Sequence, residues 1–181
     1  MKRRHKNLET GYSTVGNRKL NVYLGGKISK NCWRHDLVKG LREHLWEDGP
    51  LIQERFSYQG PFFVSCDHGC AHGEGRHGAN LDCGSVVSYE KCEIALLCIE
   101  GVQRSDLMFC YIESDDCHAT WFEVAVAFMS NIPFVLAFAP GVASPRLNPV
   151  WFASELSNWV VFDVKRASLP DVFASALGYF R

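Results

Sequence analysis

Acidic side chains are concentrated around one apolar strand and the helix that follows it, in residues 105–128. Asp106 precedes the strand, Asp116 lies in the turn after it, and Glu123 is the only charged residue in the apolar stretch of the helix. An ionised glutamate is almost never fully buried unless it is paired. Glu123 is therefore expected either to face solvent, favoured by the helix dipole, or to lie at the edge of a pocket at the carboxyl ends of the strands. Carboxylates in such a pocket could act as nucleophile and as general acid or base.

A second group of reactive side chains lies in residues 66–84, a stretch without hydrophobic periodicity. Three interpretations stay open. The loop could bind zinc, although its spacing fits no standard finger and no metal is assigned. It could instead be an active-site lid whose Asp67, His68 and His72 touch substrate, or an ordinary surface loop. Its cysteines and histidines are Cys66, His68, Cys70, His72, His77 and Cys83.

The composition is typical of one globular domain. The chain has 181 residues, 47% of them hydrophobic, and a net charge of −1, which argues against a general nucleic-acid binder. No apolar run has membrane-spanning length, and the basic stretch at 1–19 lacks the apolar segment of a signal peptide. We expect 1–19 to be a flexible tail, 20–181 to be the domain, and the eight cysteines to be free thiols in a cytoplasmic protein.

Strands and helices alternate along the chain, which predicts an α/β fold in three layers around a mainly parallel sheet of about five strands. One helix is predicted from Trp33, because Trp33, Leu37, Leu41 and Leu45 recur every four residues, and Gly49-Pro50 would end it. The expected strands are 20–25, 61–65, 107–112, 133–139 and 159–164, and the other expected helices are 86–103, a helix starting near 120, 151–156 and 170–179.

Three blocks of sequence resemble a known family. The blocks are VYLGGKIS…WR at 22–34, RSDLMFCYI at 104–112 and DDCHATWFEVAVA at 115–127. In this order and spacing they are similar to the nucleoside 2-deoxyribosyltransferase-like proteins, whose signature is D-x-x-G-T-x-x-E-x-G-x-A. The chain departs from that signature at Ala119 and Ala125, where the family has glycine. The resemblance implies a flavodoxin/Rossmann-like fold and cleavage of the N-glycosidic bond of a nucleoside or nucleotide, by hydrolysis or deoxyribosyl transfer.

The resemblance also implies roles for individual residues. Glu123 matches the family nucleophile, and Asp106 and Asp116 match carboxylates that hold the sugar or base. Tyr23 and Gly25 match the first-strand loop that lines the pocket. A homo-oligomer is expected as well, because a neighbouring subunit commonly completes the pocket in this family.

Residues of the first loop could add contacts to a substrate. Backbone amides at Gly25 and Gly26 could bind an anion such as a 5′-phosphate, with charge from Lys27 or Arg34, or the glycines could simply form a tight turn. Trp33 could stack on a base or belong to the core. No cofactor is expected for catalysis.

Two other functions stay open beside glycosidic cleavage. One is an NAD-cleaving hydrolase resembling the TIR domains, which share the α/β layout and use a glutamate. The other is a nucleotide-sensing or binding module without catalysis, which the alanines at 119 and 125 favour.

Overall fold

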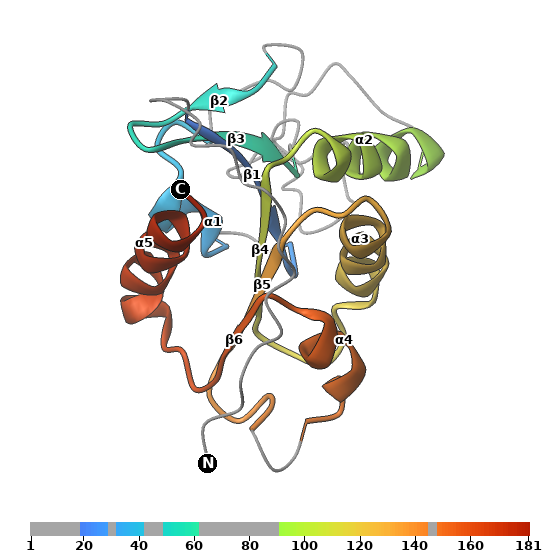
Figure 1. The fold of residues 1–181 in the computed structure, drawn as a ribbon, viewed down its shortest axis with the longest axis vertical. Helices are drawn as coiled ribbons and strands as arrows, with labels where there is room; N and C mark the ends of the chain where they lie inside the picture. The colour runs from blue at the N-terminus through green and yellow to red at the C-terminus, as the bar shows by residue number, and fades with distance from the viewer. Residues whose placement is uncertain (1–18, 29–31, 42–48, 62–90, 145–147) are drawn as a thin grey trace, which may run out of the picture.

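The computed structural model describes residues 19–28, 32–41, 49–61, 91–144 and 148–181, which form a three-layer α/β fold (Figure 1). A six-stranded sheet is the middle layer, and its strands have the order β2-β3-β1-β4-β5-β6. The predicted α/β class and the mainly parallel sheet are therefore confirmed. The strands are β1 (Leu20–Gly25), β2 (Leu51–Ile52), β3 (Phe56–Gly60), β4 (Leu107–Ile112), β5 (Phe134–Phe138) and β6 (Trp159–Val161).

Five of the strands are parallel, and their order defines where a ligand would bind. Only β2, at one edge, is antiparallel to its neighbour β3. Counted without β2, the order is 2-1-3-4-5, as in flavodoxin-like folds. The chain leaves β1 toward one edge for β3 and then crosses back to β4, so the order reverses between β1 and β4. Ligands of such sheets bind outside the carboxyl ends of the strands at this switch point.

The helices cover both faces of the sheet. Figure 1 shows α1 and α5 on one side and α2, α3 and α4 on the other. Two buried clusters match these sides: Val22 and Leu24 belong to the α5 side, whereas Tyr23 belongs to the side of α2 and α3, as the period of a strand requires. The helices are α1 (Arg34–Leu37), α2 (Lys91–Gln103), α3 (His118–Met129), α4 (Trp151–Leu156) and α5 (Leu169–Tyr179), with a 3-10 turn at Arg166–Ser168.

The long helix predicted from Trp33 is wrong within the described residues, because α1 has only four residues. The chain is extended at Val38, and Gly40 has a φ of +77°. The side chain of Gln53 pairs with both the N–H and the carbonyl of Lys39 and so replaces helical hydrogen bonds there. Trp33 and Leu41 are nevertheless buried. The four-residue spacing thus predicted correctly that these side chains are buried, but it predicted too long a helix. Residues 42–48 lie outside the described part.

The second strand of the chain was also misplaced. A strand was predicted at 61–65, but β2 and β3 precede it, Pro61 follows β3, and 62–65 lie outside the described residues. Strand β3 was not predicted, because Ser57 and Gln59 interrupt its apolar pattern. Both are buried, and Gln59 donates to Ser57 Oγ at 3.0 Å and to the Asn21 side chain at 3.1 Å. Satisfied hydrogen bonds thus allow polar side chains within this sheet.

The remaining elements lie close to their predicted positions. Helix α4 has the predicted bounds, and β1 and β4 do as well. Strand β6 ends three residues early, before Asp163, which has a φ of +57°. Helix α2 is described from Lys91, so the predicted start at 86 is outside the described part. No helix in the described ranges combines the length and the hydrophobicity that crossing a membrane requires.

The turn after β1 should tolerate no side chain at Gly26. Gly26 has a φ of +144°, and an added Cβ would lie 2.5 Å from the carbonyl oxygen of Tyr111. We expect Gly26→Ala to lower the free energy of unfolding by about 2 kcal/mol or more in urea denaturation. Gly178→Ala is the matched control, because a Cβ there meets nothing within 4 Å and should be neutral or slightly stabilising. Equal losses in both variants would contradict the constraint at Gly26.

Candidate active site

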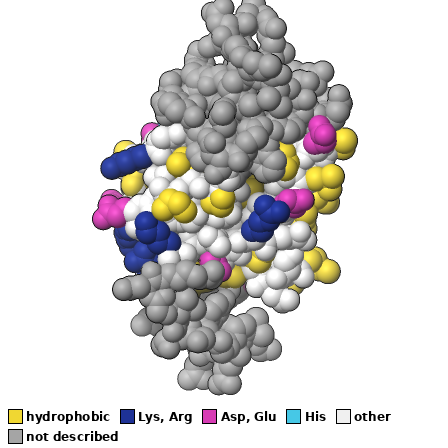
Figure 2. Space-filling model, turned by 90° about the horizontal axis from the view of Figure 1, so that it is seen from above, with side chains coloured by type: hydrophobic (Ala, Val, Ile, Leu, Met, Phe, Trp, Pro, Cys, Tyr) yellow, Lys and Arg dark blue, Asp and Glu magenta, His cyan; other side chains and the backbone are white. Residues whose placement is uncertain are grey.

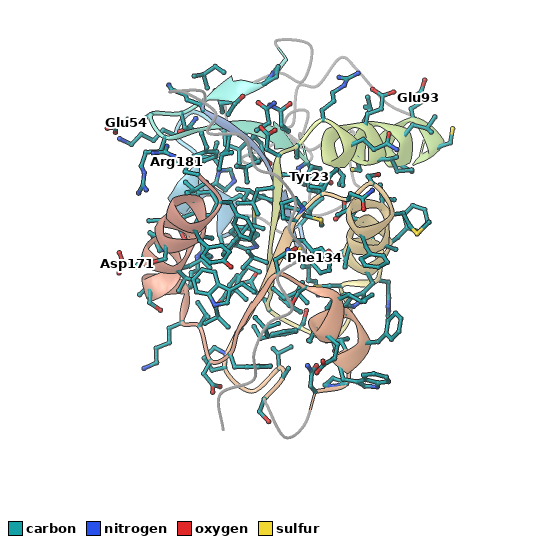
Figure 3. The ribbon with its side chains drawn as sticks, viewed as in Figure 1. Tyr23, Glu54, Glu93, Phe134, Asp171 and Arg181 are labelled. Atoms are coloured by element: carbon teal, nitrogen blue, oxygen red, sulfur yellow. The ribbon has the colours of Figure 1, made fainter. Side chains whose placement is uncertain are left out.

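The central contact of the candidate site joins the first strand to the third helix. The hydroxyl of Tyr23 in β1 donates a hydrogen bond to Glu123 Oε1 in α3 at 2.5 Å. Figure 3 shows Tyr23 on the face of the sheet that α2 and α3 cover. Two residues nearer the carboxyl end of β1, a Cβ added to Gly25 would lie 3.4 Å from the methyl group of Thr120 in α3. Tyr23 is two residues before Gly25, and Glu123 is three residues after Thr120. Helix α3 therefore runs antiparallel to β1, which places Glu123 beside Tyr23.

The carboxyl group of Glu123 is tuned to ionise near neutrality. Burial raises its pKa from 4.5 to about 7, and the hydrogen bond from Tyr23 and the positive charge of Arg34 partly oppose that rise. Tyr23 is fully buried, and its pKa is raised by burial and by the charge of Glu123. Tyr23 therefore stays protonated and acts as the donor. Perturbed carboxyl groups of this kind are candidates for nucleophile or acid–base chemistry.

An ion pair connects the two loops that flank the switch point. Lys27 Nζ, after β1, lies 2.5 Å from Asp116 Oδ2, after β4, and both side chains are about half exposed. Ser114 also donates a hydrogen bond to Asp116. The hydrogen bond from Lys27 lowers the pKa of the Asp116 carboxyl, so this group is ionised at neutral pH. An exposed ion pair is worth little in stability, which leaves both groups able to exchange partners with a ligand.

Arg34 and Trp33 support the loop after β1 from the core side. The buried guanidinium of Arg34 donates to the carbonyl oxygens of Leu24 (2.8 Å), Gly26 (2.8 Å) and Lys27 (3.1 Å). Trp33 is fully buried. It makes edge contacts with Phe109 and Tyr111. Of the two roles predicted for Trp33, it therefore has the one in the core and not that of stacking on a base. Both predicted substrate contacts thus shape the loop from within the core.

Asp106 is at the other end of the sheet from Asp116. It precedes β4, and its Oδ2 accepts a hydrogen bond from the backbone N–H of Asn21 at 2.8 Å, while its own N–H donates to the Asn21 carbonyl. These bonds align the first residues of β1 with β4. The structure therefore brings together Tyr23 and Glu123, and Lys27 and Asp116, but not Asp106 and Asp116. A role of Asp106 in catalysis stays a prediction.

One neighbour of Glu123 was not predicted as functional. Cys98 of α2 packs against the cluster that contains Tyr23. Burial and the charge of Glu123 raise the pKa of its thiol to about 11. The sequence predicted a helix over this segment but no contact of Cys98 with the site. The sequence feature that could have pointed to this residue is its place three residues before Gly101, a glycine within the same helix.

The Cys/His-rich loop at 66–84, with His68, lies outside the described residues. In the described part of the chain, no three Cys, His, Asp or Glu residues are grouped as metal ligands would be. The five cysteines there, Cys32, Cys92, Cys98, Cys110 and Cys117, are free thiols. Zinc in the loop therefore stays a prediction.

Charges on the described surface are mixed in sign. On the face shown in Figure 2, basic and acidic side chains are interspersed over the described part, with hydrophobic side chains between them. No large field of one sign is present on that part of the face, in line with the net charge of −1. No protein-family model, curated protein or solved structure matches this chain. The functional argument therefore depends on the geometry of the fold and the site.

The buried carboxyl group should make stability depend on pH. A carboxyl whose pKa is raised on folding stabilises the fold below its unfolded pKa, and this contribution is lost as pH rises through the folded pKa of about 7. Relative to Glu123→Gln, which cannot ionise, the wild-type free energy of unfolding should fall by about 2.5 kcal/mol between about pH 5 and about pH 8. Urea denaturation across this range measures the difference.

Glu155→Gln is the control for that titration, because Glu155 is exposed on α4. It removes a carboxyl group without touching the contact between Tyr23 and Glu123. Parallel curves for wild type and Glu123→Gln would show that Glu123 titrates at its ordinary pKa and would contradict the assignment.

Proposed function

We propose that this protein cleaves the N-glycosidic bond of a nucleoside or nucleotide, with Glu123 as the nucleophile. The observation that carries the proposal is the 2.5 Å hydrogen bond between Tyr23 and Glu123, in a partly buried position beside the switch point of the sheet. The sequence blocks around both residues resemble the nucleoside 2-deoxyribosyltransferase-like proteins. The site and the resemblance thus single out the same glutamate.

The chemistry follows from where charge develops. Breaking the C1′–N bond gives C1′ oxocarbenium character, which a nearby carboxylate stabilises or attacks. In the first step an oxygen of Glu123 bonds to C1′, and the base leaves with the electron pair and takes up a proton. In the second step water, or a second base, attacks C1′, loses a proton and releases Glu123. Tyr23 fixes the orientation of the carboxylate and leaves its second oxygen for attack.

The carboxyl edge of the sheet supplies groups for the rest of the substrate. Lys27 and Asp116 are exposed there, and His118 begins α3 at the same edge. Lys27 suits an anionic group such as a 5′-phosphate, if Asp116 gives it up. Asp116 is ionised and accepts hydrogen bonds, so it suits sugar hydroxyl groups better than protonation of a departing base.

A binding module without turnover is the second candidate. Two of the three carboxylates predicted as catalytic have other partners in this structure. Asp106 accepts a backbone N–H and Asp116 pairs with Lys27, and these contacts favour a site that holds a ligand without cleaving it. The same panel of compounds separates the candidates, because binding alone raises the melting temperature without releasing base.

Release of free base is the test of the proposed function. Purified protein is incubated with nucleosides, deoxynucleosides, their 5′-monophosphates and NAD, and free base is followed by chromatography. We expect release by wild type, with kcat rising through about pH 7 as Glu123 ionises, and at least about 1,000-fold less by Glu123→Gln. Release of nicotinamide from NAD alone would identify the TIR-like activity instead.

The control for this assay is again Glu155→Gln, which removes a carboxylate from a different helix and should keep full activity. Undiminished release by Glu123→Gln would refute Glu123 as the nucleophile. Thermal shifts without any release would favour the binding module.

We also propose that the protein forms a homo-oligomer through α3 and α4. The outer side chains of these two helices are apolar and exposed: Phe122 is 62% exposed, Met129 78%, Trp151 63% and Phe152 64%. Exposed apolar side chains grouped in this way mark interaction surfaces. Apart from His118 and Glu123, α3 has no ionisable side chain, so two copies could meet along α3 without like charges opposing each other.

Charges placed on α3 should dissociate that oligomer. The double variant Phe122→Glu and Met129→Glu should have the mass of a single chain in light scattering and should still fold, because both side chains are exposed in the single chain. Ile52→Glu on β2 is the control, since Ile52 is 61% exposed at the far edge of the sheet and should leave the mass unchanged. A wild-type protein with the mass of one chain would contradict the proposal.

A further inference from the structure

Helix α2 packs on the tyrosine that binds Glu123, and it does so through a glycine. A Cβ added to Gly101 would lie 3.1 Å from both Cδ2 and Cε2 of Tyr23 and 2.8 Å from the carbonyl oxygen of Gln59. Carbon atoms in ordinary contact are about 3.5–4.0 Å apart, so neither neighbour leaves room for a side chain. The backbone of α2 therefore lies directly against the Tyr23 ring and the end of β3.

Hydrogen bonds hold the last turn of α2 in this place. In a continuing helix the backbone N–H of Ser105 would bond to the carbonyl of Gly101. Here that N–H bonds to the carbonyl of Val102 at 2.9 Å, and the buried Ser105 hydroxyl donates to the Gly101 carbonyl at 2.8 Å instead. Asp106 follows directly and pairs with the backbone of Asn21 in β1. The end of α2 is thus fixed relative to β1.

The contact of α2 with the sheet is concentrated at this turn. Between residues 92 and 103, Gly101 and Val102 are buried, whereas residues 92–100 and Gln103 are half-buried or exposed. Figure 1 shows α2 beside α3, the helix that carries Glu123, on the same face of the sheet. A change at Gly101 therefore alters the one buried turn through which α2 meets the Tyr23 ring.

We propose that Gly101 is a positioning residue for Glu123: the absence of a side chain lets the last turn of α2 pack on the Tyr23 ring and hold the Tyr23 hydroxyl against the carboxyl group. The inference rests on the proposed role of Glu123. The ring is fixed by the backbone of β1 at one end and by α2 along one edge, so its hydroxyl has a single place. An alanine at 101 must displace the ring or move α2 off it, and either change weakens the 2.5 Å hydrogen bond.

An effect that acts through Tyr23 can be separated from a general loosening of the site. The Tyr23 hydroxyl favours the ionised carboxylate, so weakening its hydrogen bond raises the pKa of Glu123. Arg34 and Cys98 also act on this carboxyl group. A change that works through them, or through water that enters the site, does not need the hydroxyl. A substitution at 101 that works through Tyr23 therefore has no effect once the hydroxyl has been removed.

The experiment is a double-mutant cycle read by NMR titration of protein labelled with 13C at the glutamate carboxyl carbons. The Glu123 signal is assigned by its loss in Glu123→Gln. We expect Tyr23→Phe to raise the pKa of Glu123 by about 1 unit and Gly101→Ala to raise it by about 0.5 unit. The double variant should titrate as Tyr23→Phe does. Gly178→Ala is the matched control, because the same substitution in α5 meets nothing within 4 Å and should titrate as wild type.

A second variant tests the same contact without adding atoms. Ser105→Ala removes the hydrogen bond to the Gly101 carbonyl and so loosens the last turn of α2. It should raise the pKa of Glu123 in the same direction as Gly101→Ala, and only while Tyr23 keeps its hydroxyl. Where Gly101→Ala does not fold, this variant decides alone, and an unchanged titration overturns the proposal.

The outcomes separate this inference from the proposed function. The titration needs no turnover, so a shift that disappears in Tyr23→Phe supports the positioning role even where the panel of compounds gives no free base. Where base is released, the midpoint of kcat against pH should move with the titration. The proposal is overturned if Gly101→Ala titrates as wild type, if it lowers the pKa of Glu123, or if its shift persists in Tyr23→Phe.

Discussion

The hydrogen bond between Tyr23 and Glu123 is the contact on which the site depends, because it joins residues that are 100 positions apart in the chain. Its donor requires that Tyr23 point to the α2 side of the sheet, while its neighbours Val22 and Leu24 fill the other core. Its acceptor requires that α3 run back along β1. The bond places a carboxyl group with a pKa of about 7 near the switch point of a doubly wound sheet.

The loop after β1 is held in shape by Gly26 and by the buried Arg34, whose positive charge also acts on the pKa of Glu123. Gly26 is required by its φ and by the Tyr111 carbonyl, and the buried guanidinium of Arg34 binds three carbonyl oxygens of the segment 24–27. Lys27 is thereby held at the edge of the sheet and pairs with Asp116 across the switch point. Gly26 and Arg34 thus fix the shape of the loop at the edge of the site. The ion pair of Lys27 and Asp116 can exchange its partners for a ligand.

Hydrophobic patterns predicted the parts of the fold that bury apolar side chains and failed where polar side chains are satisfied internally. The continuous apolar runs of β4 and β5 and the helix α4 were found in place, and Glu123 was singled out as a lone charge on an apolar helix. Strand β3 was missed because its Ser57 and Gln59 bond to each other and to Asn21. The helix from Trp33 was predicted too long because Gln53, distant in sequence, captures the backbone of Lys39. The close contact of Gly101 with Tyr23 could not be predicted, because it depends on how α2 packs on the sheet.

The central claim is that Glu123 forms a covalent bond to the sugar. The most direct measurement is the peptide mass of protein mixed with a 2′-fluoro nucleoside, whose fluorine slows hydrolysis of a glycosyl adduct, and quenched in acid. The account predicts a peptide that contains Glu123 and is heavier by the mass of the fluorosugar less one water, with no such peptide from Glu123→Gln. Release of base with no adduct on Glu123, or with the sugar on another residue, would contradict it.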